Sequence, residues 1–336
     1  METEKLAEVT RGALVESVHR GAIAVVNWQG EIIASAGNPS YLTYFRSAAK
    51  PLQALAVIES GAVVKYAFTL KEIAIMISSH SGEPEHCEVV MGILEKLGLG
   101  EEYLQCGISA PFHKPSNEAL LIEGLEPTPL HNCCSGKHVG MLTMARYLNL
   151  SLDDYFLPEH SVQQEMLQSV AEMAGLEPKE IPFSIDGCGV PVFALTLDKM
   201  AYSYARLAVP EGLSEMKNAA CDIVKEAIIN YPYLVAGTGR FTTDLLQVTG
   251  HKLIAKDGSE AIFCLGVPDK GWGIAIKIKD GNERAMAPVV LSVLEQLELL
   301  TAEEKERLAA YRRIVLKNNR EQVVGEIRPA FTLKRT

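Results

Sequence analysis

The placement of β-rich segments constrains the fold of this 336-residue chain more than any other feature. Gly21–Val26 and Glu31–Ser35 flank a turn at Gln29-Gly30 and predict an N-terminal hairpin. Further strands are expected only near the other end of the chain, at Lys252–Lys256, Ala261–Leu265, Gly273–Lys279 and Val323–Ile327. Because single hairpins are unstable in isolation, these segments predict one sheet assembled from both termini around a helical insertion, an α/β (α+β) fold.

The central region shows apolar residues at helical spacing. Helices are expected at Ser47–Glu59, Leu70–Ile77, Glu85–Leu97, Gly136–Tyr147, Gln163–Ala174, Leu195–Leu207, Ser214–Ile229 and Ala285–Leu300, and residues 106–135 are expected to be rich in loops. No repeat or linker interrupts the chain, so residues 1–336 are expected to form a single catalytic domain, divided at most into sheet-containing and helical subdomains. Gly237-Thr238-Gly239 is only a fragment of a nucleotide-binding fingerprint, and no P-loop is present, which argues against a doubly wound nucleotide binder.

Charge and cysteine usage exclude several classes of protein. Lys and Arg total 32 against 42 for Asp and Glu, and a formal charge of −10 disfavours nucleic acid and acidic membranes as partners. No stretch approaches the roughly 18 apolar residues of a bilayer span, and the charged N-terminus lacks the apolar core of a secretion signal. The seven cysteines are an odd number, which favours reduced thiols and a cytoplasmic protein.

Three segments resemble parts of a serine-hydrolase site. Ser47 and Lys50 lie on one face of an expected first helical turn, since Pro51 is tolerated only there. A neutral lysine there is a competent base for a serine nucleophile, although a serine cap beside a surface lysine is equally simple. The polar junction Ser78–Pro84 and then Lys256-Asp257-Gly258 follow in the order of the β-lactamase and penicillin-binding motifs.

Two further segments have both a functional and a structural interpretation. His131–His138 and Cys188 supply thiols and imidazoles that suit zinc, and Cys134 with His138 has the spacing of a ligand pair. Buried, inert thiols explain the same residues equally well. Arg240, after Gly237-Thr238-Gly239, suits a carboxylate ligand, and a simple tight turn is the alternative.

Seven blocks, in order, resemble the rhizobial-type (class 3) L-asparaginase family from about Val18 to Ala330. They are Tyr44-Phe45-Arg46-Ser47-Ala48-Ala49-Lys50-Pro51, Ser79-His80-Ser81-Gly82-Glu83-Pro84, Cys134-Ser135-Gly136-Lys137-His138, Asp186-Gly187-Cys188-Gly189-Val190-Pro191, Ala236-Gly237-Thr238-Gly239-Arg240, Gly266-Val267-Pro268-Asp269-Lys270-Gly271-Trp272-Gly273 and Gly325-Glu326-Ile327-Arg328-Pro329-Ala330. The resemblance implies a fold similar to serine β-lactamases and glutaminases, a homodimer, and hydrolysis of L-asparagine to L-aspartate and ammonia. No organic cofactor is implied.

The resemblance also implies roles for individual residues. Its two Ser–Lys pairs fall on Ser47 with Lys50 and on Ser79 with Lys256. Its zinc ligands fall on Cys134, Lys137 and Cys188, which replaces His138 as a ligand, and its substrate contacts fall on Arg46, His138 and Asp186. Two positions depart from the family pattern, which often has Asn at Cys133 and Asp at Thr242.

The expected mechanism is acyl transfer, in which Ser47 or Ser79 attacks the side-chain amide, Lys50 activates Ser47, and Lys256 activates or orients Ser79. Zinc is expected to position the substrate and Asp186. A glutaminase, or a peptide or β-lactam hydrolase, shares the Ser-x-x-Lys logic and is the first alternative. A noncatalytic metal-binding or dimeric regulatory protein on the same scaffold is the second.

Overall fold

The computed structural model describes residues 2–336. Contacts divide the chain into two compact units. The first, here called the sheet unit, comprises the chain up to Thr43 with Leu195–Val209 and Asp244–Thr336. The second, the helical unit, comprises Tyr44–Ala194 and Pro210–Thr243.

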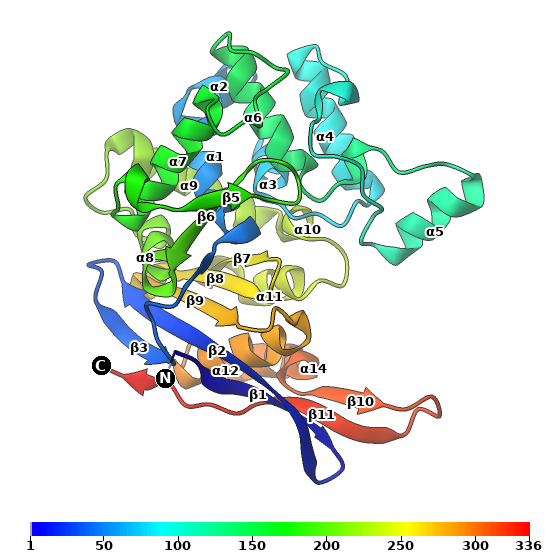
Figure 1. The fold of residues 1–336 in the computed structure, drawn as a ribbon, viewed down its shortest axis with the longest axis vertical. Helices are drawn as coiled ribbons and strands as arrows, with labels where there is room; N and C mark the ends of the chain where they lie inside the picture. The colour runs from blue at the N-terminus through cyan, green and yellow to red at the C-terminus, as the bar shows by residue number, and fades with distance from the viewer. Residues whose placement is uncertain (1) are drawn as a thin grey trace. The chain divides into compact units, whose positions relative to one another are not determined.

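The sheet unit is built on a nine-stranded sheet to which both termini contribute (Figure 1). Its main order is β10-β11-β1-β2-β9-β8-β7, with β3 paired to β2 and β12 to β3. The strands are β1 (Glu4–Arg11), β2 (Leu14–Asn27), β3 (Ile32–Ala36), β7 (Ile254–Gly258), β8 (Ile262–Val267), β9 (Trp272–Ile278), β10 (Ile314–Lys317), β11 (Val323–Pro329) and β12 (Lys334–Arg335). The prediction of a mixed α/β fold with one sheet from both termini is confirmed.

Helices of the sheet unit pack on this sheet. They are α8 (Leu197–Ala208), α12 (Met286–Gln296), α13 (Ala302–Arg307) and α14 (Ala309–Arg312). Helix α8 lies against β2, β8 and β9, and α12 lies against β1 and β11. A Cβ atom on Gly273 would lie 1.7 Å from the carbonyl oxygen of Ala201, so a glycine in β9 is what lets α8 approach so closely.

The helical unit buries helices rich in apolar residues against one another. Its elements are α1 (Lys50–Glu59), α2 (Ala62–Lys65), α3 (Leu70–Ile77), α4 (Pro84–Leu97), α5 (Lys114–Glu123), α6 (Ser135–Tyr147), α7 (Ser161–Ala174), α9 (Glu215–Asn230), α10 (Pro232–Val235) and β5 (Phe183–Ile185), while β4 (Leu42–Tyr44), β6 (Pro191–Thr196) and α11 (Phe241–Thr249) run across its boundaries. Helix α3 contacts α1, α4, α6 and α9. A Cβ on Gly136 would lie 1.9 Å from the Ile75 carbonyl oxygen, so α6 can reach α3 only through a glycine. Among residues 2–336, no helix is both long and apolar enough to cross a bilayer.

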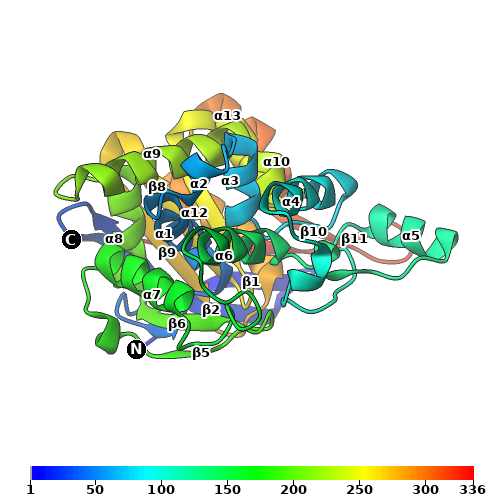
Figure 2. The ribbon, with the colours of Figure 1, turned by 90° about the horizontal axis from the view of Figure 1, so that it is seen from above.

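Several elements differ from the sequence-based expectation. β1 was not expected, because its alternating charged residues resemble a solvated end, although its buried residues Leu6, Ala7 and Val9 face other strands. β5, β6, β10 and β12 were also missed, because short strands carry little periodic signal. The region expected to be loop-rich contains α5, which buries no residue and stands apart from the other helices of its unit (Figures 1 and 2). The helix expected to run to Leu300 ends at Gln296.

Candidate active site

Lys50 and Ser79 are hydrogen-bonded in the interior of the helical unit. Lys50 is the first residue of α1, with Pro51 in the first turn as expected, and only 1% of it is exposed. Its Nζ lies 3.2 Å from Ser79 Oγ and also donates to the carbonyl oxygens of Ser78 at 2.5 Å and Cys133 at 3.4 Å. The start of α1 therefore meets the segment that follows α3, and a buried amine contacts a buried hydroxyl.

The structure gives Lys50 a different serine partner from the one expected. Ser47 lies in the 3-10 helix Arg46–Ala49 directly before α1 and is buried, yet Lys50 forms no hydrogen bond with its hydroxyl within the described chain. A buried amine needs hydrogen-bond partners, and the carbonyl oxygens of Ser78 and Cys133 accept hydrogen bonds from it. The hydroxyl that Lys50 contacts is thus that of Ser79, and the expected role of Lys50 toward Ser47 stays a prediction.

Arg46, which directly precedes Ser47 in the chain, forms an ion pair with Asp186. Arg46 Nη2 lies 3.0 Å from Asp186 Oδ1. Arg46 also has a φ of 51°, a left-handed conformation that non-glycine residues rarely adopt and that concentrates at functional sites. Its Nε atom is buried and has no hydrogen-bond partner in the described chain. The arginine is thus held by one carboxylate while a second donor is left for a ligand.

Lys137, Cys188 and Cys134 form a buried chain of polar groups. Lys137 Nζ lies 3.2 Å from Cys188 Sγ, and Cys134 Sγ lies 3.9 Å from Cys133 Sγ. The pKa of Cys134 lies well below its ordinary value because the thiols of Cys133 and Cys188 donate hydrogen bonds to it. Its position at the N-terminus of α6 acts in the same direction.

The protons of this cluster follow from those contacts. Burial lowers the pKa of Lys137, but the charges of Cys188 and Cys134 outweigh burial and raise it above its ordinary value. The pKa of Cys188 is raised because it donates its proton to Cys134 and is buried. The contacts within this cluster therefore lower the pKa of Cys134 and raise the pKa values of Cys188 and Lys137.

The donor atoms of this cluster suit a soft or borderline metal ion. Two thiols and an amine, each on a residue at most 6% exposed, are ligands of the type zinc accepts. Within residues 2–336, no group of three or more His, Cys, Asp or Glu residues is arranged to hold a metal. Because Lys137 is protonated in the metal-free cluster, a metal would have to displace its proton.

His138 follows Lys137 on α6 and is completely buried. Its Nδ1 lies 2.7 Å from the hydroxyl of Tyr155, and its Nε2 is buried without a hydrogen-bond partner in the described residues. Burial lowers the pKa of His138 to about 3, and the positive charges of Lys137 and Lys50 add to this effect. His138 is therefore neutral at ordinary pH. Sequence reasoning missed Tyr155, because no local pattern links it to α6.

The Gly237-Thr238-Gly239 segment closes against a buried carboxylate. Thr238 donates from its backbone N–H to Glu83 Oε1 at 2.8 Å and from its hydroxyl to Glu83 Oε2 at 2.7 Å. A Cβ on Gly237, whose φ is 129°, would lie 2.4 Å from Ser81 Oγ. The absence of a side chain at Gly237 thus allows its loop to pack closely against the loop that contains Ser81. This agrees with the interpretation of the segment as a tight turn. Arg240 lies over the Phe112 ring, 6.0 Å from its centroid.

Lys256 belongs to the sheet unit. It lies within β7, is completely buried, and donates from Nζ to the backbone carbonyl of Asp257 at 2.8 Å and to its Oδ1 at 2.9 Å. Its expected position on a strand is confirmed, and its pairing with Ser79 stays a prediction. The other nine predicted site residues all belong to the helical unit.

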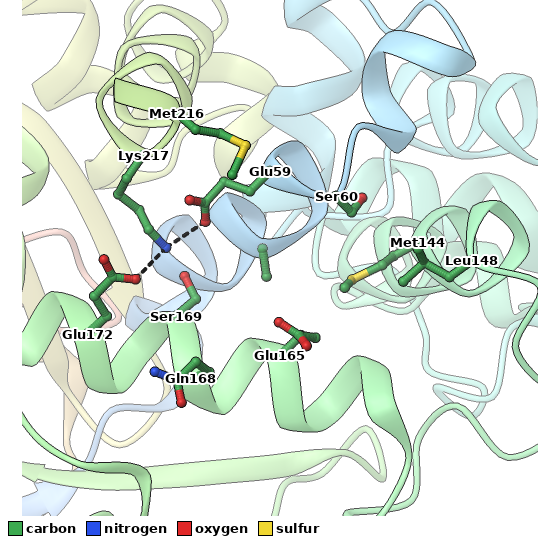
Figure 3. Close-up of a pocket in the computed structure, with 11 residues that line it drawn as sticks. Glu59, Ser60, Met144, Leu148, Glu165, Gln168, Ser169, Glu172, Met216 and Lys217 are labelled. Carbon is green, nitrogen blue, oxygen red and sulfur yellow. Dashed lines mark ion pairs between the residues drawn. The ribbon is translucent and has the colours of Figure 1, made fainter. Parts of the chain in front are cut away.

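A separate cavity of about 340 Å³ opens in the helical unit between α1, α7 and α9 (Figure 3). Lys217 Nζ lies at its wall, 2.5 Å from Glu59 and 3.0 Å from Glu172. None of the predicted site residues lines it. The ion pairs join three helices, so Lys217 has a structural role there.

Comparisons with known proteins were consistent with one family. A family model described as L-asparaginase II matches residues 7–329. A search of curated proteins found no match. The chain is similar to three solved structures at low identity. They are a β-lactamase from Mycobacterium bovis (16% identity, 82% of this chain and 94% of that chain, TM-score 0.44), Mglu in its tris and glutamate form (14%, 83% and 59%, 0.40) and the D-alanine carboxypeptidase AmpC from Burkholderia cenocepacia (12%, 87% and 92%, 0.38). With TM-scores below 0.5, these three likenesses carry no argument about function.

Proposed function

The chain belongs to the L-asparaginase II family, and we propose that it hydrolyses L-asparagine to L-aspartate and ammonia through an acyl-enzyme on Ser79. Membership of this family makes the protein an amidohydrolase. The observation that carries the proposed mechanism is the buried contact of 3.2 Å between Lys50 Nζ and Ser79 Oγ. A hydroxyl within hydrogen-bond reach of a candidate base is the arrangement that nucleophilic catalysis requires.

Lys50 is proposed as the base of the acylation step. Ser79 Oγ attacks the carbon of the side-chain amide as its proton passes to Lys50, and the carbonyl oxygen gains the negative charge of a tetrahedral intermediate. When that intermediate collapses, the carbon–nitrogen bond breaks and Lys50 returns the proton to the departing ammonia. Water then attacks the acyl ester, gives a proton to Lys50, and releases L-aspartate as the proton returns to Ser79 Oγ. The sequence consumes one water molecule and restores both side chains.

Nearby donors support binding of a substrate that carries carboxylate and amide oxygens. Arg46 Nε is an N–H donor that is buried and has no hydrogen-bond partner in the described residues. His138 Nε2 is a nitrogen in the same condition. Unpaired buried polar atoms are costly, which is a reason to expect a ligand at them. We propose Asp186 as the residue that orients Arg46, since the two are ion-paired. Lys256 is kept as a proposed second lysine of the site, on the resemblance to the family.

We further propose that Cys134, Lys137 and Cys188 hold zinc. The support is the buried cluster of two cysteine sulfur atoms and a lysine amine, whose donor types suit that metal. When bound, zinc would act as an electrostatic anchor that positions the substrate. Lys137 and the two cysteines would have to lose their protons on binding, so they couple the site to pH. A homodimer is proposed on the family resemblance alone, and sedimentation velocity tests it.

The decisive experiment measures ammonia released from L-asparagine, L-glutamine and a chromogenic β-lactam, with zinc supplied and pH scanned. We expect turnover of L-asparagine, and its loss in Lys50→Met, because the variant keeps the buried stem without the amine. A matched control is Lys217→Met, which removes a second buried lysine away from the site. Absence of asparagine turnover in a folded, zinc-supplied protein would overturn the proposal, and turnover of one of the other two substrates would identify a different amidohydrolase.

A further inference from the structure

The hydrogen bonds around Tyr155 fix where the proton of His138 lies. The Tyr155 oxygen accepts a hydrogen bond from the backbone N–H of Gln105 at 2.9 Å and lies 2.7 Å from His138 Nδ1. Tyr155 and His138 are both completely buried. The backbone N–H of Gln105, the hydroxyl of Tyr155 and Nδ1 of His138 must therefore share their hydrogen bonds among themselves.

Only one arrangement of hydrogens satisfies all of these groups. If Nδ1 carried the proton, the Tyr155 oxygen would accept two hydrogen bonds and its own hydroxyl hydrogen would have no acceptor in the described chain. If instead the hydroxyl donates to Nδ1, both of its contacts are satisfied. A neutral imidazole whose Nδ1 accepts must carry its proton on Nε2. His138 therefore has an Nε2–H group.

That Nε2–H group has no partner within the described residues, although it is fully buried. A buried donor without an acceptor is rare and destabilising, so its presence points to a ligand that supplies the acceptor. His138 lies one helical turn after Cys134, whose carbonyl accepts its backbone N–H at 3.0 Å. The unpartnered donor thus belongs to the cluster that holds the candidate site.

We propose that Tyr155 is a positioning residue that holds His138 in the Nε2–H form, so that His138 donates a hydrogen bond to an oxygen of the amide substrate and does not bind the metal. A protonated Nε2 cannot be a metal ligand, and Nδ1 is occupied by Tyr155. The assignment separates His138 from the neighbouring Lys137 and Cys134, which are proposed as ligands. Its substrate half rests on the proposed asparagine hydrolysis, and its tautomer half does not.

The tautomer is measured directly by long-range ¹H–¹⁵N correlation spectra of protein labelled with ¹⁵N-histidine, with His138→Gln used to assign the resonances. In the wild type we expect a pyrrole-type Nε2 and a pyridine-type Nδ1, both before and after zinc is added. In Tyr155→Phe we expect the Nδ1–H form to gain population. Tyr311→Phe is the matched control, because its hydroxyl is bonded to Asp244 within the sheet unit, and it should leave the His138 signals unchanged.

Two results would overturn the tautomer assignment. One is a pyridine-type Nε2 in the wild type, with or without zinc. The other is an unchanged pattern in Tyr155→Phe. The wild-type spectrum tests the assignment even if the variant does not fold.

The substrate half is tested with L-aspartate, the product, as the probe. Saturating L-aspartate should shift the His138 Nε2–H resonance, and Tyr155→Phe should raise KM for L-asparagine by roughly five- to tenfold with a smaller change in kcat, as expected for one lost hydrogen bond. Calorimetric binding of L-aspartate without any shift at Nε2–H, or an unchanged KM, would overturn this half. A protein that shows the expected tautomer but no asparagine turnover would refute the proposed function and leave the role of Tyr155 intact.

Discussion

Replacing Ser79 by alanine is expected to abolish most of the amidase activity, whereas the same change at Ser47 is expected to leave much of it. The difference follows from one contact. Lys50 Nζ lies 3.2 Å from Ser79 Oγ and forms no hydrogen bond with the hydroxyl of Ser47, although Ser47 is nearer in the sequence. Both serines are buried, so exposure does not distinguish them.

The size of the difference can be estimated. Loss of the attacking oxygen at Ser79 is expected to lower kcat/KM by about 10³-fold or more, equivalent to about 4 kcal/mol of transition-state stabilisation. Ser47→Ala removes no hydrogen bond to Lys50 and is expected to cost less than about tenfold, or ~1.4 kcal/mol. Stability should change little in Ser79→Ala, by about 1 kcal/mol, because Lys50 keeps the carbonyls of Ser78 and Cys133.

The assay compares ammonia release from L-asparagine by the two variants and the wild type, with thermal unfolding measured on the same preparations. Ser169→Ala is the matched control, because Ser169 is a fully buried serine of the helical unit whose hydroxyl donates to the Leu52 carbonyl at 2.8 Å. It should lose some stability and no activity. Mass spectrometry of acid-quenched reactions should find the acyl group on the peptide that contains Ser79.

The reasoning fails if Ser47→Ala loses as much activity as Ser79→Ala, or if the acyl group is found on Ser47. Either result would mean that Lys50 changes partner during the reaction, so that the hydrogen bond to Ser79 is a resting arrangement. Full activity in Ser79→Ala would remove this serine from the chemistry altogether.

Three further predictions concern the metal cluster and the packing of the helical unit. Cys134→Ser should weaken zinc binding by about tenfold or more. The zinc affinity of the wild type should rise with pH, because Lys137, whose pKa is raised, must lose its proton. Titration with a zinc-responsive dye at several pH values checks both, and a pH-independent affinity would contradict the ligand set. Lys217→Met should lower the free energy of unfolding by about 2 kcal/mol in urea titrations, since it removes the ammonium group that pairs with Glu59 and Glu172. An unchanged midpoint would show that those ion pairs add nothing. Gly136→Ala should destabilise the folded protein by about 2 kcal/mol or more, because the new Cβ would clash with a backbone carbonyl of α3. Gly92→Ala lies in open space on α4 and should stabilise the folded protein by roughly 0.5–1 kcal/mol. Equal effects of the two variants in thermal melts would refute the packing argument.

The sequence predicted the principal helices and most central strands because their patterns are local. β7, β8 and β9 are nearly continuous apolar runs, and α3 and α4 have regular apolar spacing with clear ends. It did not predict β1 or α5. Strand β1 pairs with the adjacent β2 and with β11, more than 300 residues away, but its charged residues Glu4, Lys5 and Glu8 interrupt the apolar pattern by which strands are recognised. Helix α5 buries nothing, so it lacks the apolar stripe by which helices are recognised.

The candidate site divides in the same way. Spacing and residue type alone singled out Ser47, Lys50 and the cysteine segment, and the family resemblance added Arg46, Asp186 and the lysine ligand. Both paired Lys50 with Ser47 and did not predict its contact with Ser79, because a four-carbon side chain can reach groups far from its own helical turn. That choice depends on the carbonyls of Ser78 and Cys133, which the tertiary fold brings to its amine.

The sequence by itself determined the type of fold, the family and the stock of reactive groups, because these depend on residue identity and short-range order. Tertiary structure alone decided how protons and hydrogen bonds are shared among those groups. The pKa of Cys134 is lowered because Cys133 and Cys188 donate hydrogen bonds to it, and His138 presents Nε2–H because Tyr155 occupies its other nitrogen. Such states depend on atoms within about 3–4 Å of one another, and residues distant in the chain reach those separations only in the folded protein.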